Sequence, residues 1–241
     1  MIMNIIYSFS QGLQLGATTI IISNVLDNTV SSKETIAQMK KDENLYTNGL
    51  QANYINLLLI GPIYYIVVYN WLTNPDKEGF YPMDYVGIVF IHNLLYFTAH
   101  FLMHTVPYLK DIHNFHHKFQ DVIPSNGNAV SVLEFNFAYV IPFVIGALLL
   151  KPNNLTFKLG VSTISILNTM IHTPAFKNLR YVSMIVTPYD HMMHHQTRTH
   201  TYSAPLLNFD YFMKELYVTL GYWKQIVILK YEHFKKSHHV D

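Results

Sequence analysis

The sequence predicts an all-α integral membrane protein, a helical bundle with about four spanning helices and a cytosolic, histidine-rich helical cap. Half of the 241 residues are hydrophobic and only 13% are charged, which leaves few charges to cover a water-soluble surface. Four apolar segments are each close to the roughly 20 residues that a helix needs to cross a bilayer. The chain also contains 14 histidines, most of them clustered near the ends of those segments. A soluble helical protein that buries its apolar helices is the alternative, because the mean hydropathy is only slightly positive.

Charge and cysteine content exclude several classes of function. The formal net charge is +1, so the chain lacks the excess of basic residues with which proteins bind nucleic acid through its phosphates. It contains no cysteine, which excludes disulfides, thiolate metal sites and a thiol nucleophile. Any metal site must therefore be built from histidines and carboxylates.

The first 53 residues are predicted to be a membrane-associated and polar segment that precedes the main membrane domain, residues 54–241. Residues 1–26 are apolar with interspersed polar residues, which fits a re-entrant, interfacial or weakly spanning helix. They lack a basic start and a small-residue cleavage site, so we expect no cleavable signal peptide. Residues 27–53 are polar and are predicted to form a loop or a surface helix in water.

Four stronger segments are predicted to span the membrane. They are residues 54–72, 84–103, 130–150 and 156–176. Pro62 and Pro142 lie inside two of them, which a bilayer helix tolerates when neighbouring groups satisfy the freed carbonyls. The tail, residues 206–234, is predicted to be a membrane-surface helix that covers the cytosolic face, or else an ordinary amphipathic packing helix.

The distribution of basic residues orients these spans. If the first of the four runs outward, only Lys77, Lys151 and Lys158 lie on the non-cytoplasmic side, and the other 13 of the 16 basic residues lie on the cytoplasmic side. This orientation places both dense histidine clusters at the cytoplasmic face. Clusters that are distant in sequence can therefore meet there.

The first cluster combines two spacings that bring imidazoles together on a helix. His100 and His104 are four residues apart, so their side chains lie one above the other at the end of a span. His113, His116 and His117 have i, i+3 and i+4 spacing. We expect this second motif to place three ring nitrogens on one side of a helix.

The second cluster adds four further candidate ligands. His191, His194 and His195 repeat the i, i+3, i+4 spacing, and His172 lies at the cytoplasmic end of the last predicted span. Nine imidazoles exceed the four ligands of tetrahedral zinc and the usual ceiling of six for iron, so they imply two metal ions. No glutamate stands between the ligands as in the His-Glu-x-x-His motif of metalloproteases, and neutral nitrogen ligands with open positions suit iron and O₂ chemistry.

In their order and spacing, these motifs resemble the histidine boxes of the fatty acid hydroxylase and sterol desaturase superfamily, which are integral membrane, non-haem di-iron oxygenases. The resemblance covers about residues 84–212. Ile171-His172-Thr173 and Thr187-Pro188 resemble the alkylglycerol monooxygenase-like branch, and Glu134 lies where the family often has an acidic residue.

The resemblance also extends to the region after the last box. Tyr202 and Asp210 match family positions there and are assigned to a substrate lid, while the residues around them depart from the family pattern. The resemblance implies one further metal ligand beyond the nine. His200 ranks first for this position, with Asn168 and His92 as alternatives.

The resemblance implies an oxidoreductase that hydroxylates or desaturates a lipid, such as a sterol, a fatty acyl chain, a sphingoid base or an ether lipid. Two iron ions would be the cofactor, although zinc can replace iron during purification. O₂ and a separate electron donor, such as cytochrome b5 or a reductase, would be the partners. We expect a multi-pass protein of the endoplasmic reticulum with the metal site on the cytoplasmic side. A histidine-rich membrane protein that binds or transports metal, and a superfamily member without activity, are the alternatives.

Overall fold

The computed structural model describes residues 2–31, 33–179, 181–199 and 201–237. Within these ranges the chain is helical, and an isolated β-bridge pairs Ile185 with Leu207. The all-α prediction is therefore confirmed. In chain order the elements are α1 (Ile2–Thr29), α2 (Lys33–Lys40), α3 (Glu43–Ile55), η1 (Asn56–Ile60), α4 (Gly61–Val67), η2 (Val68–Leu72), α5 (Pro82–Thr105), α6 (Pro107–Asn114), η3 (His116–Lys118), η4 (Pro124–Asn126), α7 (Val132–Glu134), η5 (Phe135–Val140), α8 (Ile141–Leu150), α9 (Asn154–Ile171), η6 (Pro174–Phe176), α10 (Pro188–Thr197) and α11 (Phe209–Ser237).

Two of the long helices widen into π-helical turns just before a proline. The π-turn η1 ends one residue before Gly61-Pro62, and η5 ends one residue before Ile141-Pro142. A proline ring would clash with the carbonyl four residues earlier in a regular α-helix, and a wider turn relieves that clash. The segments Glu43–Leu72 and Val132–Leu150 therefore stay continuous. The division that the sequence suggests between residues 53 and 54 falls inside the first of them.

Four of the described helices are long and apolar enough to cross a membrane, which makes the chain a multi-pass membrane protein. They are Ile2–Thr29, Glu43–Leu72, Pro82–Thr105 and Val132–Leu150. The last three contain the spans predicted at 54–72, 84–103 and nearly all of 130–150. The first is a continuous helix of 28 residues, which favours a span among the three alternatives for the N-terminal segment.

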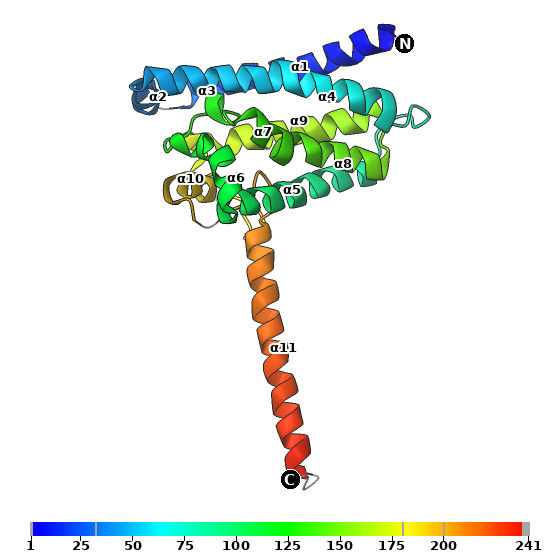
Figure 1. The fold of residues 1–241 in the computed structure, drawn as a ribbon, viewed down its shortest axis with the longest axis vertical. Helices are drawn as coiled ribbons and strands as arrows, with labels where there is room; N and C mark the ends of the chain where they lie inside the picture. Colours follow the sequence, from blue (N-terminus) through cyan, green and yellow to red (C-terminus); the bar gives the residue numbers. More distant parts are fainter. Residues whose placement is uncertain (1, 32, 180, 200, 238–241) are drawn as a thin grey trace.

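The predicted span at 156–176 forms α9, but this helix ends at Ile171 and is not among those four. Its sequence carries Lys158 and a series of serines, threonines and asparagines, which lower its hydropathy. It nevertheless runs the length of the bundle and packs against α1 and α5 (Figure 1). The Lys158 Nζ donates a hydrogen bond to the Gln11 Oε1 of α1 at 2.5 Å. Neighbouring helices thus supply partners that the bilayer core cannot.

Small residues let α1 approach the rest of the bundle closely. Gly12 and Gly16 lie four residues apart on the face of α1 that packs against α4 and η1. A Cβ at Gly16 would lie 1.9 Å from the Leu57 carbonyl oxygen, so no larger residue fits without movement of the backbone. This is the small-residue packing by which helices associate in membranes.

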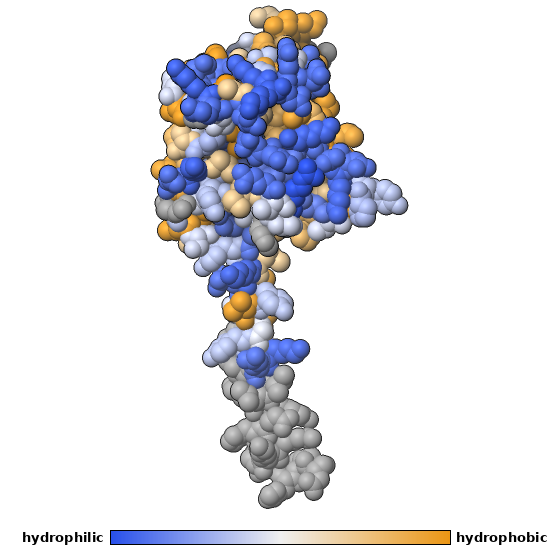
Figure 2. Space-filling model, turned by 90° about the vertical axis from the view of Figure 1, so that its left-hand side faces the viewer, coloured by the Kyte–Doolittle hydropathy of each residue, from blue (hydrophilic) through white to orange (hydrophobic). Residues whose placement is uncertain are grey.

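The histidines gather at one end of the bundle. In Figure 1, α1, α4, α5, α8 and α9 lie roughly side by side, and α2, α6 and α10 sit together at the end opposite to the short loop between α8 and α9. Figure 2 views the molecule from that end and shows polar residues concentrated there, with apolar residues around the margin. The cap is therefore the part of the bundle that is suited to water.

The C-terminal helix forms where the sequence predicts it, but it does not cover the histidine-bearing face. It begins beside α5, where Phe209 packs against Phe90 and Phe97, and then projects away from the bundle (Figure 1). In its described side chains Tyr217 and Leu220 are largely exposed. Tyr202, in the segment before this helix, lies beside the His104 and His194 rings instead.

Candidate metal centre

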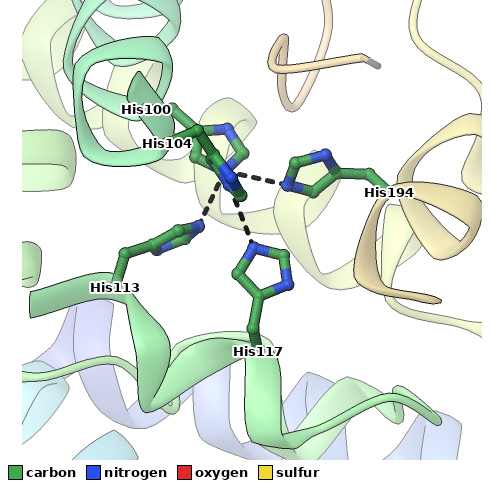
Figure 3. Close-up of side chains that lie close together, drawn as sticks. All are labelled: His100, His104, His113, His117 and His194. Carbon is green, nitrogen blue, oxygen red and sulfur yellow. Dashed lines mark hydrogen bonds between the residues drawn. The ribbon is translucent and has the colours of Figure 1, made fainter. Parts of the chain in front are cut away.

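Five imidazoles converge at the inner end of the cap. They belong to His100 and His104 of α5, His113 of α6, His117 of η3 and His194 of α10, and their ligand atoms lie within 4.8 Å of one another. The His100 Nε2 lies 2.9 Å from the His113 Nε2 and 3.1 Å from the His194 Nε2. Figure 3 shows the five rings pointing toward a common centre. We call this set the five-histidine group.

Four further imidazoles form a second set beside the first. His116, His172, His191 and His195 have ligand atoms within 4.8 Å of one another, and all four side chains are buried. The His191 Nε2 lies 3.0 Å from the His172 Nε2 and 3.2 Å from the His195 Nε2. The buried His116 Nε2 has no hydrogen-bond partner among the described residues. We call this set the four-histidine group.

The structure corrects the expectation that each His-x-x-His-His motif presents three nitrogens on one side. His113 and His117 belong to the five-histidine group, whereas His116 belongs to the four-histidine group. Successive residues of an α-helix turn by about 100°, so a residue at i+4 points about 40° from residue i, and one at i+3 points about 60° to the other side. The i, i+4 pair therefore serves one group and the i+3 residue serves the other.

The second motif follows the same rule with the groups exchanged. His191 and His195, four residues apart on α10, both belong to the four-histidine group, and His194 belongs to the five-histidine group. Each motif thus contributes to both groups and ties them together. The nine histidines that spacing selected all lie in these two groups.

The nitrogens of each group lie close enough together to bind one ion. Metal–imidazole bonds are about 2.1 Å long, so ligands at right angles lie about 3.0 Å apart and tetrahedral ligands about 3.4 Å apart. The shortest Nε2 separations in the two groups run from 2.9 to 3.2 Å, and all ligand atoms of a group lie within 4.8 Å of one another. Iron commonly takes five or six nitrogen and oxygen ligands, whereas structural zinc is usually tetrahedral. The five-histidine group therefore fits iron by its number of ligands, and the four-histidine group fits either ion.

Burial keeps these imidazoles in the form that binds metal. Desolvation, together with the neighbouring His172 ring, lowers the pKa of His191 well below its usual value. Desolvation and the rings of His116 and His191 do the same to the pKa of His195. A neutral imidazole has a free lone pair, and a protonated one has none. Both side chains are thus ready to act as ligands at neutral pH.

Backbone carbonyls orient four of the nine rings through their second nitrogen. The Nδ1 of His100 lies 2.7 Å from the Tyr202 carbonyl oxygen. In the four-histidine group the equivalent acceptors are the carbonyls of Ala129 for His116 (3.3 Å), Asn168 for His172 (2.7 Å) and Phe119 for His195 (3.0 Å). An N–H at Nδ1 that donates to these oxygens leaves the lone pair on Nε2, which faces the centre.

Glu134 performs this task for His113. Its Oε1 lies 2.6 Å from the His113 Nδ1, and both side chains are almost fully buried. Ser131 caps the short helix that carries Glu134, since its Oγ accepts a hydrogen bond from the Glu134 N–H. The sequence marks Glu134 only as an acidic residue at a family position. Only the fold shows that His113 is its partner.

Local sequence signals position α10 and its three histidines. Thr187 and Asp190 form a reciprocal capping box, and Pro188 occupies the first turn, where a missing N–H costs nothing. Arg198 ends the helix in the left-handed conformation, with φ 57°. Its guanidinium donates to the His117 carbonyl oxygen at 3.2 Å and to the Asn114 Oδ1 at 3.3 Å. The end of α10 is thereby fixed to the segment that carries the first motif.

The two residues assigned to a lid lie next to the site. The Tyr202 ring is 5.1 Å from the His104 ring and 5.6 Å from the His194 ring, measured between centroids. Asp210, in the first turn of α11, accepts hydrogen bonds from the Ser203 N–H at 2.8 Å and from the Ser203 Oγ at 2.6 Å. Asp210 thus holds the segment that places Tyr202 over the five-histidine group. Whether the segment moves as a lid stays a prediction.

The three residues considered as an additional ligand differ in their placement. His200 lies outside the described residues. The Asn168 Nδ2 donates to the Gly127 carbonyl and the Asn128 Oδ1, so this amide is engaged with the backbone and side chain of another segment and not with the histidines. His92 is two turns before His100, about 12 Å along α5, and packs against the Phe143 ring with a centroid distance of 4.2 Å.

Comparison with known proteins places this arrangement in context. The family model described as fatty acid hydroxylase matches residues 85–215, which is more than half of the chain and includes all nine histidines. No curated protein and no solved structure matches the chain.

Removing one ligand of the smaller group should release one ion. We expect His116→Ala to lower the bound metal from about two ions per chain to about one, because three nitrogens hold an ion more weakly than four while the five-histidine group stays intact. Metal analysis of the detergent-purified protein measures this. His92→Leu, at a buried histidine outside both groups, is the control and should retain both ions. If His116→Ala retains about two ions per chain, the four-histidine group does not bind metal as inferred.

Glu134→Gln keeps the size of the side chain and an acceptor oxygen but removes the charge opposite His113. We expect the metal affinity of the five-histidine group to fall about 10- to 100-fold, as for other outer-shell partners of ligating histidines. Competition with a chelator of known affinity gives the change. The same substitution at the exposed Glu215 of α11 should have no effect, and equal affinities for the two variants would argue against the role of Glu134.

Proposed function

Because the chain belongs to the fatty acid hydroxylase family, we propose that it is a membrane-bound, non-haem di-iron oxygenase that hydroxylates or desaturates a lipid. The observation that carries the proposal is the pair of adjacent groups of buried imidazoles, five and four, at one end of a membrane-spanning bundle. A group of five imidazoles suits iron, and burial supports the neutral state that iron requires.

The nine histidines of the two groups would hold the metal. When bound, two iron ions would supply the reductive activation of O₂ that oxidises an unactivated C–H bond. The chain's own residues do the remaining work. Eight of the nine histidines are at most 2% exposed, which excludes bulk water from the place where a reactive oxidant would form. Glu134 holds a proton at the His113 Nδ1, and the Tyr202 ring closes the outer side of the five-histidine group.

An apolar cavity supports a lipid as the substrate. It lies between α1, α4, α8 and α9, and its walls include Tyr65, Val144, Phe157 and Val161. At the cap end it reaches Asn168, whose carbonyl accepts the hydrogen bond from the His172 Nδ1. Phe157 and Asn168 are eleven residues apart on α9, about 16 Å along its axis. A single hydrocarbon chain fits such a long apolar space within the membrane-spanning region.

The location and the electron supply follow from the same proposal. The sequence assigns all basic residues other than Lys77, Lys151 and Lys158 to the same side of the spans as the histidine clusters, so we propose that the metal centre faces the cytoplasm. Electrons would come from a separate donor, such as cytochrome b5 or a reductase. The endoplasmic reticulum is the expected membrane.

Metal transport uses the same ligands but predicts a different layout. A transport path needs binding groups at successive depths across the membrane. The described histidines of the two groups are instead gathered at one end of the bundle, and His92 lies alone among aromatic rings. This placement favours catalysis.

The lipid content of cells with and without the chain tests the proposal directly. We expect mass spectrometry to find one lipid class that gains one oxygen or loses two hydrogens when the intact protein is expressed. The His194→Ala variant, which removes one member of the five-histidine group, should not produce this change. Identical lipids in cells with the intact chain and with the variant, under iron-replete and aerobic conditions, would argue against the oxygenase.

Filling the cavity should separate lipid binding from metal binding. We expect Val161→Trp to reduce turnover at least tenfold while the metal content stays unchanged, because the indole occupies the space for the chain. Leu159→Trp, on the exposed side of the same helix, is the control and should leave turnover nearly unaffected. Full turnover in Val161→Trp would place the substrate elsewhere.

A further inference from the structure

The loop at residues 123–130 separates the four-histidine group from the N-terminal helices. It follows the first histidine motif and precedes α7, and most of its residues are buried. The short helix η4 opens it, and the Asn126 Oδ1 accepts a hydrogen bond from the Ile123 N–H at 3.0 Å. We call this segment the 123–130 loop.

One side of the 123–130 loop contacts two of the four histidines. The Ala129 carbonyl accepts the hydrogen bond from the His116 Nδ1 at 3.3 Å. Gly127 lies against the His172 ring, since a Cβ at this glycine would be 3.2 Å from the ring Cγ and Nδ1. The conformation of the loop therefore sets the orientation of His116 and limits the position of His172.

Asn168 connects the loop to His172 a second time. Its Nδ2 donates to the Gly127 carbonyl and to the Asn128 Oδ1, each at 3.3 Å. Its backbone carbonyl accepts from the His172 Nδ1 at 2.7 Å. A displacement of the loop would thus reach His172 through its ring and through its hydrogen-bond partner.

The other side of the loop is held by two asparagines of the Glu43–Leu72 helix. The Asn53 Nδ2 donates to the Ser125 carbonyl at 2.9 Å. The Asn56 Nδ2 donates to the carbonyls of Val130 at 2.9 Å and Asn128 at 3.2 Å. Asn56 is also the first residue of the π-turn η1. Together these bonds fix the loop at both of its ends.

The asparagines act here as donors. Both side chains are at most 2% exposed, and neither Oδ1 has a hydrogen-bond partner among the described residues. Three buried carbonyls of the loop depend on the two Nδ2 groups. Buried carbonyls without a partner are unfavourable, so loss of these donors would make the loop seek another conformation.

We propose that Asn53 and Asn56 are positioning residues, which hold the 123–130 loop in the conformation that orients His116 and His172 and thereby set the metal affinity of the four-histidine group. Both lie outside the region that the family model matches, residues 85–215. The N-terminal part of the chain therefore contributes to the centre without supplying a ligand. The inference concerns metal binding and is independent of which reaction the metal performs.

Zn²⁺ titration of the full chain, stripped of metal by a chelator, tests the proposal. Asn56→Leu and Asn53→Leu remove the donors and keep the number and branching of the side-chain heavy atoms. We expect each to weaken one of the two Zn²⁺ sites about 10- to 100-fold, as loss of outer-shell support does elsewhere. Asn70→Leu is the matched control, because Asn70 lies in the same continuous helix and donates to Ser8 and Ile66 instead of the loop.

A second background identifies which site is affected. In His116→Ala, where the four-histidine group is disabled, Asn56→Leu should change the affinity of the remaining site by less than about threefold. Equal weakening of both sites would indicate general destabilisation and would overturn the proposal, as would unchanged affinities in both asparagine variants. Thermal unfolding of the metal-free proteins checks folding. If Asn56→Leu does not fold, Asn53→Leu, which removes a single hydrogen bond, decides the outcome.

Discussion

The structure depends on holding nine neutral imidazoles together in a space that excludes water. Their Nε2 lone pairs face one another at about the separation that cis ligands of one ion would have, and among the described residues no carboxylate stands between them. Without a cation, such lone pairs repel, and buried acceptors without donors are unfavourable. The arrangement is therefore stable only where the surrounding fold is rigid and a metal supplies the missing attraction. Helix ends, caps and the outer ring of hydrogen bonds can each be understood as a means of meeting this requirement.

The membrane-spanning helices meet part of it by bringing ligands to one depth. His100 and His104 lie in the last two turns of α5, and His172 directly follows α9. Two helices that are distant in the sequence therefore end at the same face. Close packing fixes their relative height, since α5 contacts α9 along the bundle and α1 presses against η1 through Gly16. The remaining six histidines come from the cap. Because that cap faces water while the bundle faces lipid, the centre lies where an apolar substrate and water-soluble reactants can both arrive.

The sequence was sufficient for three of the spans and for the set of histidines, and insufficient for how the two groups share those histidines. Hydropathy located three spans because lipid imposes a strong constraint on composition. The fourth predicted span, α9, is less apolar, because neighbouring helices such as α1 contact its polar residues. Helical phase alone could have divided the second motif between the two groups, since His191 and His195 of α10 differ by about 40° and His194 points to the other side. The backbone carbonyls of Tyr202, Ala129 and Asn168, which accept from the histidines, could not be recognised in the sequence, because every residue has a carbonyl.

The use of backbone carbonyls as acceptors determines which side chains the centre depends on. Four of the acceptors that orient the imidazoles are main-chain oxygens, which remain when the residue that carries them is substituted, as long as the backbone keeps its path. The centre should therefore tolerate side-chain changes at Ala129 or Phe119 that fit the space. It should be sensitive at the few side chains that fix the backbone itself or act as acceptors directly. Glu134 belongs to the second kind, and Asp190, Asp210, Asn53 and Asn56 belong to the first. If the proposed positioning roles hold, metal affinity in this chain depends on these residues as well as on the ligands, through the hydrogen bonds that hold the backbone around the imidazoles.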